Sequence, residues 1–324
     1  MFNPPTDEEL HTRKVSSETA PPPAVQTKKH PTLAQREGRA GYALIGPTTV
    51  LLTIFHIWPI LQTAGYSFTN WNSASGKAEF VGLKNFVTLM NSTEFLRSAG
   101  NTLLYVIVVV PLTIGIGLFL AALLVKPFRG RGVYRAMIFI PYIAPVVGTS
   151  LIFSYILSPL GGLANQALRA IGLAPIGFLN SEPWALISVM IFSIWQGVGY
   201  TMIICLAALT NIPPTYHEAA ALDGAGPIRR FFSISVPLVA PTLAFLSVTG
   251  VIMALQVFTQ IYVLTQGGPL HSTQTILYYI YRQGFIHFNG GMASAAAMVL
   301  LVVGALFAII QLRVLRRPDT IELT

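Results

Sequence analysis

Six long apolar runs constrain the fold of this 324-residue chain more than any other feature. The runs cover residues 42–66, 103–125, 136–157, 184–209, 238–263 and 293–312, and none contains Lys, Arg, Asp or Glu. A helix needs about 20 residues to cross the hydrocarbon of a membrane. Since six charge-free runs of this length do not occur as buried helices of one soluble domain, the sequence predicts an all-α membrane protein with six transmembrane helices.

The distribution of Lys and Arg predicts how these helices are oriented. Six lie in residues 1–41, four in 126–135, two in 211–236 and three after residue 312, whereas only five occupy the other loops. Because positive residues gather in cytoplasmic loops, we expect a multi-pass protein of the cell membrane with both termini in the cytoplasm. The net charge of +8 also favours contact with membrane lipid. The sequence shows no basic face with stacking aromatics of the kind that binds nucleic acid, so we expect no nucleic-acid partner.

The same pattern divides the chain. Residues 1–40 mix Pro, Thr, Lys and Glu and cannot bury enough apolar surface to fold alone, so we expect a flexible cytoplasmic tail. Residues 41–317 form the expected six-helix transmembrane domain, and residues 318–324 a short cytoplasmic C-terminal tail. Within the loop at 158–183, residues 163–170 are predicted to form a short interfacial helix.

A polar loop, YHEAAALDGAGPIRRFFSISVP at 216–237, separates the fourth and fifth runs. A Pro-Pro pair before it stops any helix arriving from upstream. Thr215 and Glu218 have the spacing of a capping box for a helix that starts at the next residue, and Gly224 offers the left-handed conformation that ends helices. The alanines of this helix would allow close approach to a partner groove. The same residues also fit an ordinary capped, alanine-rich helix.

The order of residues in this loop resembles the EAA loop of type I ATP-binding-cassette (ABC) importer permeases. That pattern is EAA, three residues, Gly, nine residues and I-x-L-P. It is matched here by Glu218, Ala219, Ala220, Gly224, Ile234 and Pro237, with Val236 where Leu is usual. The Asp223-Gly-Ala step and the segment YVLTQGGP at 262–269 are similar to the carbohydrate-uptake branch, and the order of spans from 98 to 313 is similar to the family's transmembrane domain.

The resemblance implies a role and partners. It implies a permease subunit that translocates a sugar or sugar-like solute delivered by an extracellular binding protein. The implied partners are a homologous second permease, forming a heterodimer, and two ATPase subunits. The residues implied to couple this chain to an ATPase are Glu218, Ala219, Ala220, Asp223 and Gly224. Glu218 either meets a basic group of the ATPase or caps its own helix.

The energy source must lie outside this chain. The sequence has no GxxxxGK[ST] phosphate-binding loop, and no carboxylate in the six runs to couple transport to protons or sodium. We therefore expect a transporter subunit rather than an enzyme. It would bind no cofactor itself, because ATP and Mg²⁺ would lie on the partner ATPase. The scattered histidines and the single cysteine, Cys205, offer no metal site.

Uncharged polar residues in the fourth and fifth runs suit a neutral sugar. The fourth run carries WQGVGY at 195–200, and the fifth carries Thr249, Gln256, Thr259 and Gln260. Resemblance to maltose-type permeases implies substrate contacts at Gly197, Tyr200, Thr249, Met253 and Gln256, although Met253 and Gln256 replace Asn residues of those permeases. Each of these residues also fits interhelical packing or hydrogen bonding.

Two other classes of protein remain as alternatives. An ion-coupled secondary transporter would need no ATPase, but the docking loop and the lack of membrane carboxylates disfavour it. An integral membrane enzyme would need clustered acid, base or metal ligands near the interface, and the sequence shows no such cluster.

Overall fold

The computed structural model describes residues 45–315, apart from the side chains of Leu312, Val314 and Leu315. The predicted tails at 1–40 and 318–324 lie outside these residues. The chain divides into two compact units at Ile57 and Trp58. In the first unit, residues 45–52 are α-helical and continue into the π-helix η1 (Thr53–Ile57).

The second unit is helical, and its described part contains only two isolated β-bridges, Thr69 with Phe80 and Asn72 with Asn289. Its helices are, in order, α2 (Trp58–Ser67), α3 (Lys84–Met90), α4 (Thr93–Val125), α5 (Arg131–Ile143), α6 (Val146–Ile156), α7 (Leu163–Ala170), α8 (Trp184–Thr210), α9 (Pro214–Leu222), α10 (Pro227–Arg230), η2 (Phe231–Ser235), α11 (Val236–Leu238), α12 (Ala240–Leu255), α13 (Thr259–Leu264), α14 (Ile276–Tyr281), η3 (Arg282–Ile286) and α15 (Gly290–Leu315).

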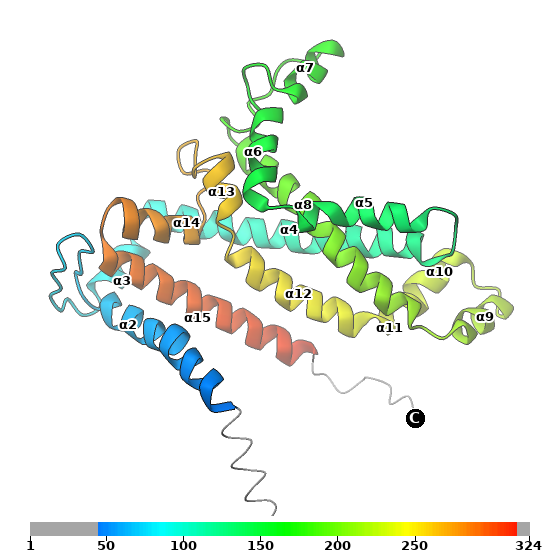
Figure 1. The fold of residues 1–324 in the computed structure, drawn as a ribbon, viewed down its shortest axis with the longest axis horizontal. Helices are drawn as coiled ribbons and strands as arrows, with labels where there is room; N and C mark the ends of the chain where they lie inside the picture. Colours follow the sequence, from blue (N-terminus) through cyan, green and yellow to red (C-terminus); the bar gives the residue numbers. More distant parts are fainter. Residues whose placement is uncertain (1–44, 316–324) are drawn as a thin grey trace, which may run out of the picture. The chain divides into compact units, whose positions relative to one another are not determined.

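The longest helices of this unit, α4 and α8, pack against each other and form its centre (Figure 1). Helix α5 covers α8, α12 packs on α4, and α15 packs on α12, α14 and α2. One apolar core joins Tyr105, Val109, Phe192 and Leu255 with Ile261 of α13. Where water reaches the protein, burial of such apolar side chains contributes most to the stability of helix packing. Inside lipid, close van der Waals packing between helices contributes more.

Close fit is visible where α8 crosses α5. A Cβ atom on Gly199 would lie 2.3 Å from the carbonyl oxygen of Ile138 and 2.8 Å from the Cα of Phe139. The two helix backbones can approach this closely only because Gly199 has no side chain. This contact holds α5 against α8 next to Tyr200, which lines a cavity between the helices.

By length and hydropathy, four helices of the described chain are able to cross a membrane: Ile45–Ser67, Thr93–Val125, Trp184–Thr210 and Gly290–Gln311. Two bent pairs, Arg131–Ile143 with Val146–Ile156 and Pro227–Leu238 with Ala240–Leu255, raise the number to six if each pair is one span. The helical class is therefore confirmed, and six spans agree with the structure on that condition.

The third predicted run, 136–157, is not one straight helix. Helix α5 begins earlier, at Arg131, and meets α6 at an angle of 96°. Pro145 causes the break, because a residue that precedes proline is pushed out of the α region, and Ala144 has φ −64° and ψ 141°. Figure 1 shows α6 turning away from α5 at this point.

The fifth predicted run, 238–263, is also interrupted. Helix α12 ends at Leu255, and α13 starts only at Thr259. The carbonyl of Val257, which no longer bonds within a helix, accepts a buried hydrogen bond of 3.1 Å from the hydroxyl of Thr275. A distant residue thus satisfies the backbone at the break, which is why the local apolar pattern did not reveal it.

Other boundaries agree more closely. The short helix predicted at 163–170 is confirmed as α7. Helix α4 starts ten residues earlier than the predicted second run, at Thr93, where the Ser92 hydroxyl accepts a bond from the Phe95 amide.

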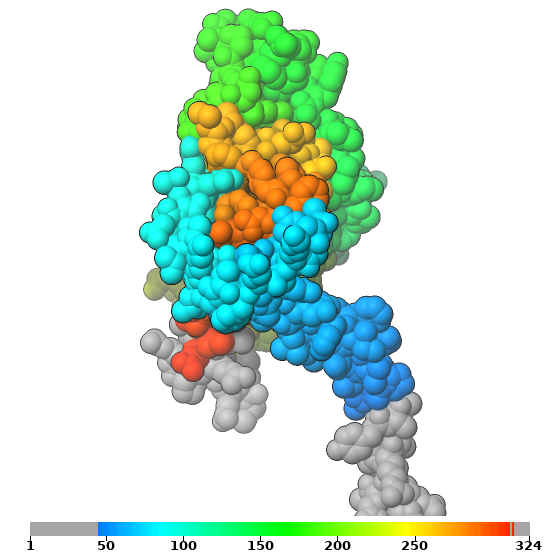
Figure 2. Space-filling model, turned by 90° about the vertical axis from the view of Figure 1, so that its left-hand side faces the viewer, coloured from blue at the N-terminus to red at the C-terminus, as the bar shows by residue number. Residues whose placement is uncertain are grey.

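The N-terminal end of α4 also packs against the C-terminal part of the fold. Leu89 and Phe95 share a buried cluster with Ile276 and Tyr279 of α14. Figure 2 shows this side, with the cyan surface of α3 and early α4 next to the orange surface of α14 and η3.

Candidate functional site

Helix α9 is the segment that the sequence predicted as a docking element, and its start differs from the prediction. The helix begins at Pro214 rather than Tyr216, and the capping residue is Pro213, with no side-chain cap. Proline is favoured in the first helical turn because the amide it lacks has no partner there. The predicted capping box of Thr215 and Glu218 is therefore wrong. No hydrogen bond or ion pair holds the exposed Glu218 carboxylate within residues 45–315.

The end of α9 matches the prediction. Gly224 has φ +75°, the Gly224 amide donates to the Ala221 carbonyl (3.1 Å), and the Ala225 amide donates to the Ala220 carbonyl (2.9 Å). This pair of bonds is a Schellman motif, which satisfies the last carbonyls of a helix. One further bond, from Arg230 to the His217 carbonyl (3.3 Å), ties α9 to α10.

The surface of α9 and the segment after it is open. Ala219 and Asp223 are exposed and Ala220 is half-buried, while Leu222, Ile228 and Phe232 are 90%, 77% and 65% exposed. Exposed apolar side chains gathered on one loop are typical of a protein–protein contact. The five predicted coupling residues thus lie together on or directly after one short exposed helix.

A cavity of about 590 Å³ lies between α4, α5, α8, α12 and the α12–α13 break. All five residues predicted to contact substrate line it: Gly197 and Tyr200 from α8, Thr249 and Met253 from α12, and Gln256 at the break. Gln196, Thr259 and Gln260, the other polar residues singled out in these runs, line it as well. The residues named here lie up to 64 positions apart in the chain, from Gln196 to Gln260, and share one space.

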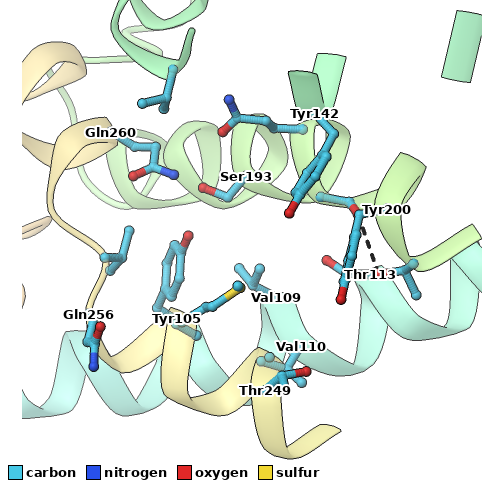
Figure 3. A pocket seen from close by; sticks show the side chains of 18 of the residues that line it. Tyr105, Val109, Val110, Thr113, Tyr142, Ser193, Tyr200, Thr249, Gln256 and Gln260 are labelled. Carbon is cyan, nitrogen blue, oxygen red and sulfur yellow. Dashed lines mark hydrogen bonds between the residues drawn. The ribbon is translucent and has the colours of Figure 1, made fainter. Parts of the chain in front are cut away.

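Aromatic rings form one end of this cavity. Tyr142 of α5 stacks on Tyr200, with ring centroids 5.0 Å apart and an angle of 23° between planes. Figure 3 shows this pair at one end and Tyr105 with Gln260 toward the other. Flat rings beside hydroxyl and amide groups provide both an apolar face and hydrogen-bonding partners.

The polar groups of the lining are uncharged and partly free. The Thr249 hydroxyl donates to the carbonyl of Phe245 (2.9 Å) and keeps its lone pairs as acceptors. The buried hydroxyl of Thr113 has no hydrogen-bond partner among the described residues. No Asp, Glu, Lys, Arg or His belongs to the lining formed by the described chain. Such a space suits a neutral polar solute.

The sequence missed part of this lining and misplaced one residue. Tyr105, Thr113, Tyr142 and Ser193 face the cavity but lie in runs or positions with no polar pattern. Trp195, in contrast, does not line the cavity; it packs on Phe153 with ring centroids 4.8 Å apart. All four offered the same weak signal, as polar groups inside otherwise apolar runs.

A group of tyrosines packs below the α12–α13 break. Tyr262, Tyr278 and Tyr281 surround Phe258, each with its ring centroid within 6.0 Å of it. Burial raises the pKa of Tyr278, and the hydrogen bond with Tyr262 raises the pKa of Tyr281. Both phenols therefore stay neutral at physiological pH and act as packing and hydrogen-bonding groups.

The cavity and α9 are joined by two helices. Helix α8 carries Tyr200 and ends at Thr210, four residues before α9 starts. Downstream of α9, α10, η2 and α11 lead directly into α12, which carries Thr249 and Met253. Helix α9 is therefore connected along the chain to two of the helices that line the cavity, α8 and α12. No group of three or more His, Cys, Asp or Glu within the described residues is placed to hold a metal ion.

Comparison with known proteins decides the family. Residues 113–319 match the family described as binding-protein-dependent transport system inner membrane component. The chain is 35% identical over 280 residues to the sn-glycerol-3-phosphate transport system permease protein UgpA of Yersinia pseudotuberculosis, covering 85% of this chain and 94% of the relative. The UgpA protein of Shigella flexneri is 35% identical over 274 residues, 84% of this chain and 92% of the relative.

The chain belongs to this family. It is an inner-membrane permease of a binding-protein-dependent ABC importer, which works with separate ATPase and solute-binding partners and is not itself an enzyme. The resemblance stated from the EAA loop is thus confirmed, and the ion-coupled alternative has no support.

Solved structures agree with this assignment. The fold matches a chain of a bacterial alginate ABC transporter in complex with a periplasmic protein bound to alginate pentasaccharide, with a TM-score of 0.78, 26% identity, and coverage of 87% of this permease and 96% of that chain. A second alginate importer structure gives a TM-score of 0.77 at 27% identity, with 88% and 97% coverage. The fold is therefore that of a type I ABC importer transmembrane domain.

Proposed function

We propose that this permease carries a neutral sugar or polyol through the cavity between α4, α5, α8 and α12. The observation that carries the proposal is the lining: Gly197, Tyr200, Thr249, Met253 and Gln256 surround a space with stacked tyrosines, to which the described part of the chain contributes no charged residue. Hydroxyls of a sugar exchange hydrogen bonds with amide and hydroxyl groups, and its apolar ring face packs on Tyr200.

An anionic solute is the second candidate, because the relatives transport sn-glycerol-3-phosphate or the acidic polysaccharide alginate. A buried anion needs a cationic or strongly donating partner to offset its lost hydration. This chain contributes no Lys, Arg or His to the described lining. An anionic solute would therefore have to be neutralised entirely by other subunits, which is why the neutral solute is preferred.

The proposed assembly contains this permease, a homologous second permease and two ATPase subunits, with an extracellular protein that delivers the solute. ATP and Mg²⁺ bind to the ATPases, and this chain holds no cofactor. Both termini and α9 face the cytoplasm, as the excess of Lys and Arg in their loops supports. Membrane lipid surrounds the outer faces of the spans.

Coupling occurs at α9. Ala219 and Ala220 allow close contact with the ATPase, Glu218 and Asp223 offer charge at the contact, and Gly224 ends the helix. When ATP draws the two ATPases together, α9 moves and rotates α8 and α12, so that the cavity opens to one side of the membrane at a time.

Reconstituted complexes test the choice of solute. The complete transporter, with its binding protein, is placed in vesicles and supplied with ATP, and uptake of neutral sugars and polyols is compared with uptake of glycerol phosphate and uronate oligosaccharides. The proposal predicts that a neutral compound drives uptake and stimulates ATP hydrolysis. Stimulation by the anionic compounds alone would establish the second candidate instead.

A further inference from the structure

A second hollow lies between the N-terminal parts of α4 and α8. It is a groove of about 610 Å³, and it shares no residue with the cavity. Its lining is Arg97, Asn101, Leu104, Val108 and Leu112 from α4, Leu186, Ile187, Met190, Ile191 and Ile194 from α8, and Glu182, Pro183 and Ser272 at one end. The transport mechanism above uses none of these residues.

The groove has an apolar length and a polar end. From Leu104 to Leu112 on α4, and from Leu186 to Ile194 on α8, every lining residue is aliphatic or Met. The residues with charges or hydrogen-bonding side chains gather where both helices begin. This end is remote from α9, which follows the opposite end of α8. Along α4, Arg97 and Leu112 are separated by about 22 Å at 1.5 Å per residue.

The polar end carries both signs of charge. Arg97 and Glu182 form an ion pair through one guanidinium nitrogen and one carboxylate oxygen, and each side chain remains 43% exposed. The other N–H groups of the guanidinium and the second carboxylate oxygen are left for further partners. Ser272 lines the same end, is only 8% exposed, and its buried hydroxyl has no hydrogen-bond partner among the described residues.

We propose that this groove binds one phospholipid with a zwitterionic headgroup, that is, a phosphate joined to a primary ammonium. Arg97 and the Ser272 hydroxyl donate to the phosphate, and Glu182 accepts from the ammonium. An acyl chain lies along Leu104, Val108 and Ile191. One leaflet has a headgroup layer and a hydrocarbon layer. Arg97 at the polar end would bond a phosphate in the first, and the apolar length of the groove would contact acyl chain in the second.

The dimensions favour a lipid over a protein helix. The hydrocarbon of a whole membrane is about 30 Å thick, so one leaflet is about half of that. The groove covers about the depth of one leaflet with its headgroup layer, and its polar groups lie at one end only. A spanning helix of the second permease would need an apolar contact through both leaflets and would meet the exposed Arg97–Glu182 pair at its end.

Native mass spectrometry of the purified transporter complex tests the site. The complex is stripped of lipid in detergent, titrated with phosphatidylethanolamine or phosphatidylglycerol, and the bound molecules are counted. Ile191→Trp fills the groove from a side chain that is 58% exposed, and Ile107→Trp is the matched control, with 59% exposure on α4 outside the groove. Arg97→Gln removes the phosphate partner without changing the apolar length.

The proposal predicts that the wild-type complex retains phosphatidylethanolamine more tightly than phosphatidylglycerol. Ile191→Trp should abolish this retention and Ile107→Trp should leave it unchanged. Arg97→Gln should weaken retention of phosphatidylethanolamine about tenfold, as expected for loss of a charge-assisted bond. If Ile191→Trp fails to assemble, the retention measured for Arg97→Gln tests the site by itself. Equal retention by wild type and Arg97→Gln would overturn the proposal, as would cross-linking of a cysteine at position 191 to the second permease.

Discussion

Gly224 is the residue at which the geometry of α9 is most sensitive to substitution. Its φ of +75° disfavours any side chain and most of all a β-branched one, by about 1–2 kcal/mol. Gly224→Val should therefore fray the end of α9 and reduce uptake per assembled complex by about five- to thirtyfold. Uptake and ATP hydrolysis are measured together in vesicles, and hydrolysis should continue while uptake falls.

Gly226 provides the control, since it lies two residues away with φ −68° and no atom of the described residues lies within 4 Å of an added Cβ. Gly226→Val should transport nearly as well as the wild type. Normal uptake by Gly224→Val, or equal losses in both variants, would show that the left-handed turn is not needed for coupling.

Gly199 controls the fit of α5 on α8. Because an added Cβ would lie 2.3 Å from the Ile138 carbonyl oxygen, Gly199→Ala should force the helices apart and destabilise the complex by about 1–3 kcal/mol. Gly148→Ala in α6, where nothing lies within 4 Å, should be neutral. Thermal unfolding of the assembled complex measures both, and equal melting temperatures would contradict the close contact.

Single residues also show how far the sequence could be read. Gly197 and Tyr200 were placed by a fixed motif on one helix, and the structure does bring them to a cavity. Tyr105 and Tyr142 could not be found in the same way. They reach the cavity because α4 and α5 pack on α8, and that arrangement depends on contacts such as Gly199 with Ile138, which no local pattern encodes.

At the scale of elements, apolar length predicted where helices occur but not where they break. The break after α5 had a local signal, the proline at 145, although a proline within an apolar run does not always end a helix. The break after α12 had none, because it depends on a hydrogen bond from Thr275, eighteen residues away. The capping box at Thr215 failed for a related reason, since Pro214 starts the helix first.

The α12–α13 break yields its own prediction. Thr275→Val keeps the shape of the side chain but leaves the buried Val257 carbonyl without its donor, which costs about 1–3 kcal/mol, and it also removes the hydroxyl that accepts from the Tyr278 amide at the start of α14. The variant should melt at a lower temperature and transport less, because Gln256 and Gln260 flank this break and line the cavity. Thr275→Ser retains the hydroxyl and should behave like the wild type. Equal melting temperatures of the two variants would show that this hydrogen bond does not stabilise the break.

At the scale of the whole molecule, the orientation proposed from Lys and Arg is open to direct test. Single cysteines at Ser233 and Ser75, both exposed, are introduced with Cys205→Ser, which removes the buried native thiol. An impermeant thiol reagent applied to intact cells should label position 75 and not position 233, and both should react in open membranes. Labelling of position 233 in intact cells would contradict the proposed orientation.

We propose that solute passes through the cavity lined by Tyr200 and Gln256. The most direct test of this proposal is the initial uptake rate per assembled complex in vesicles that contain the whole transporter. Loss of one hydrogen bond to a neutral sugar should lower apparent affinity about three- to tenfold in Gln256→Ala. Tyr200→Ala also loses the stacked face shared with Tyr142 and should be worse, whereas Ile107→Ala, outside the cavity, should match the wild type. Wild-type uptake per complex in both cavity variants would contradict the account.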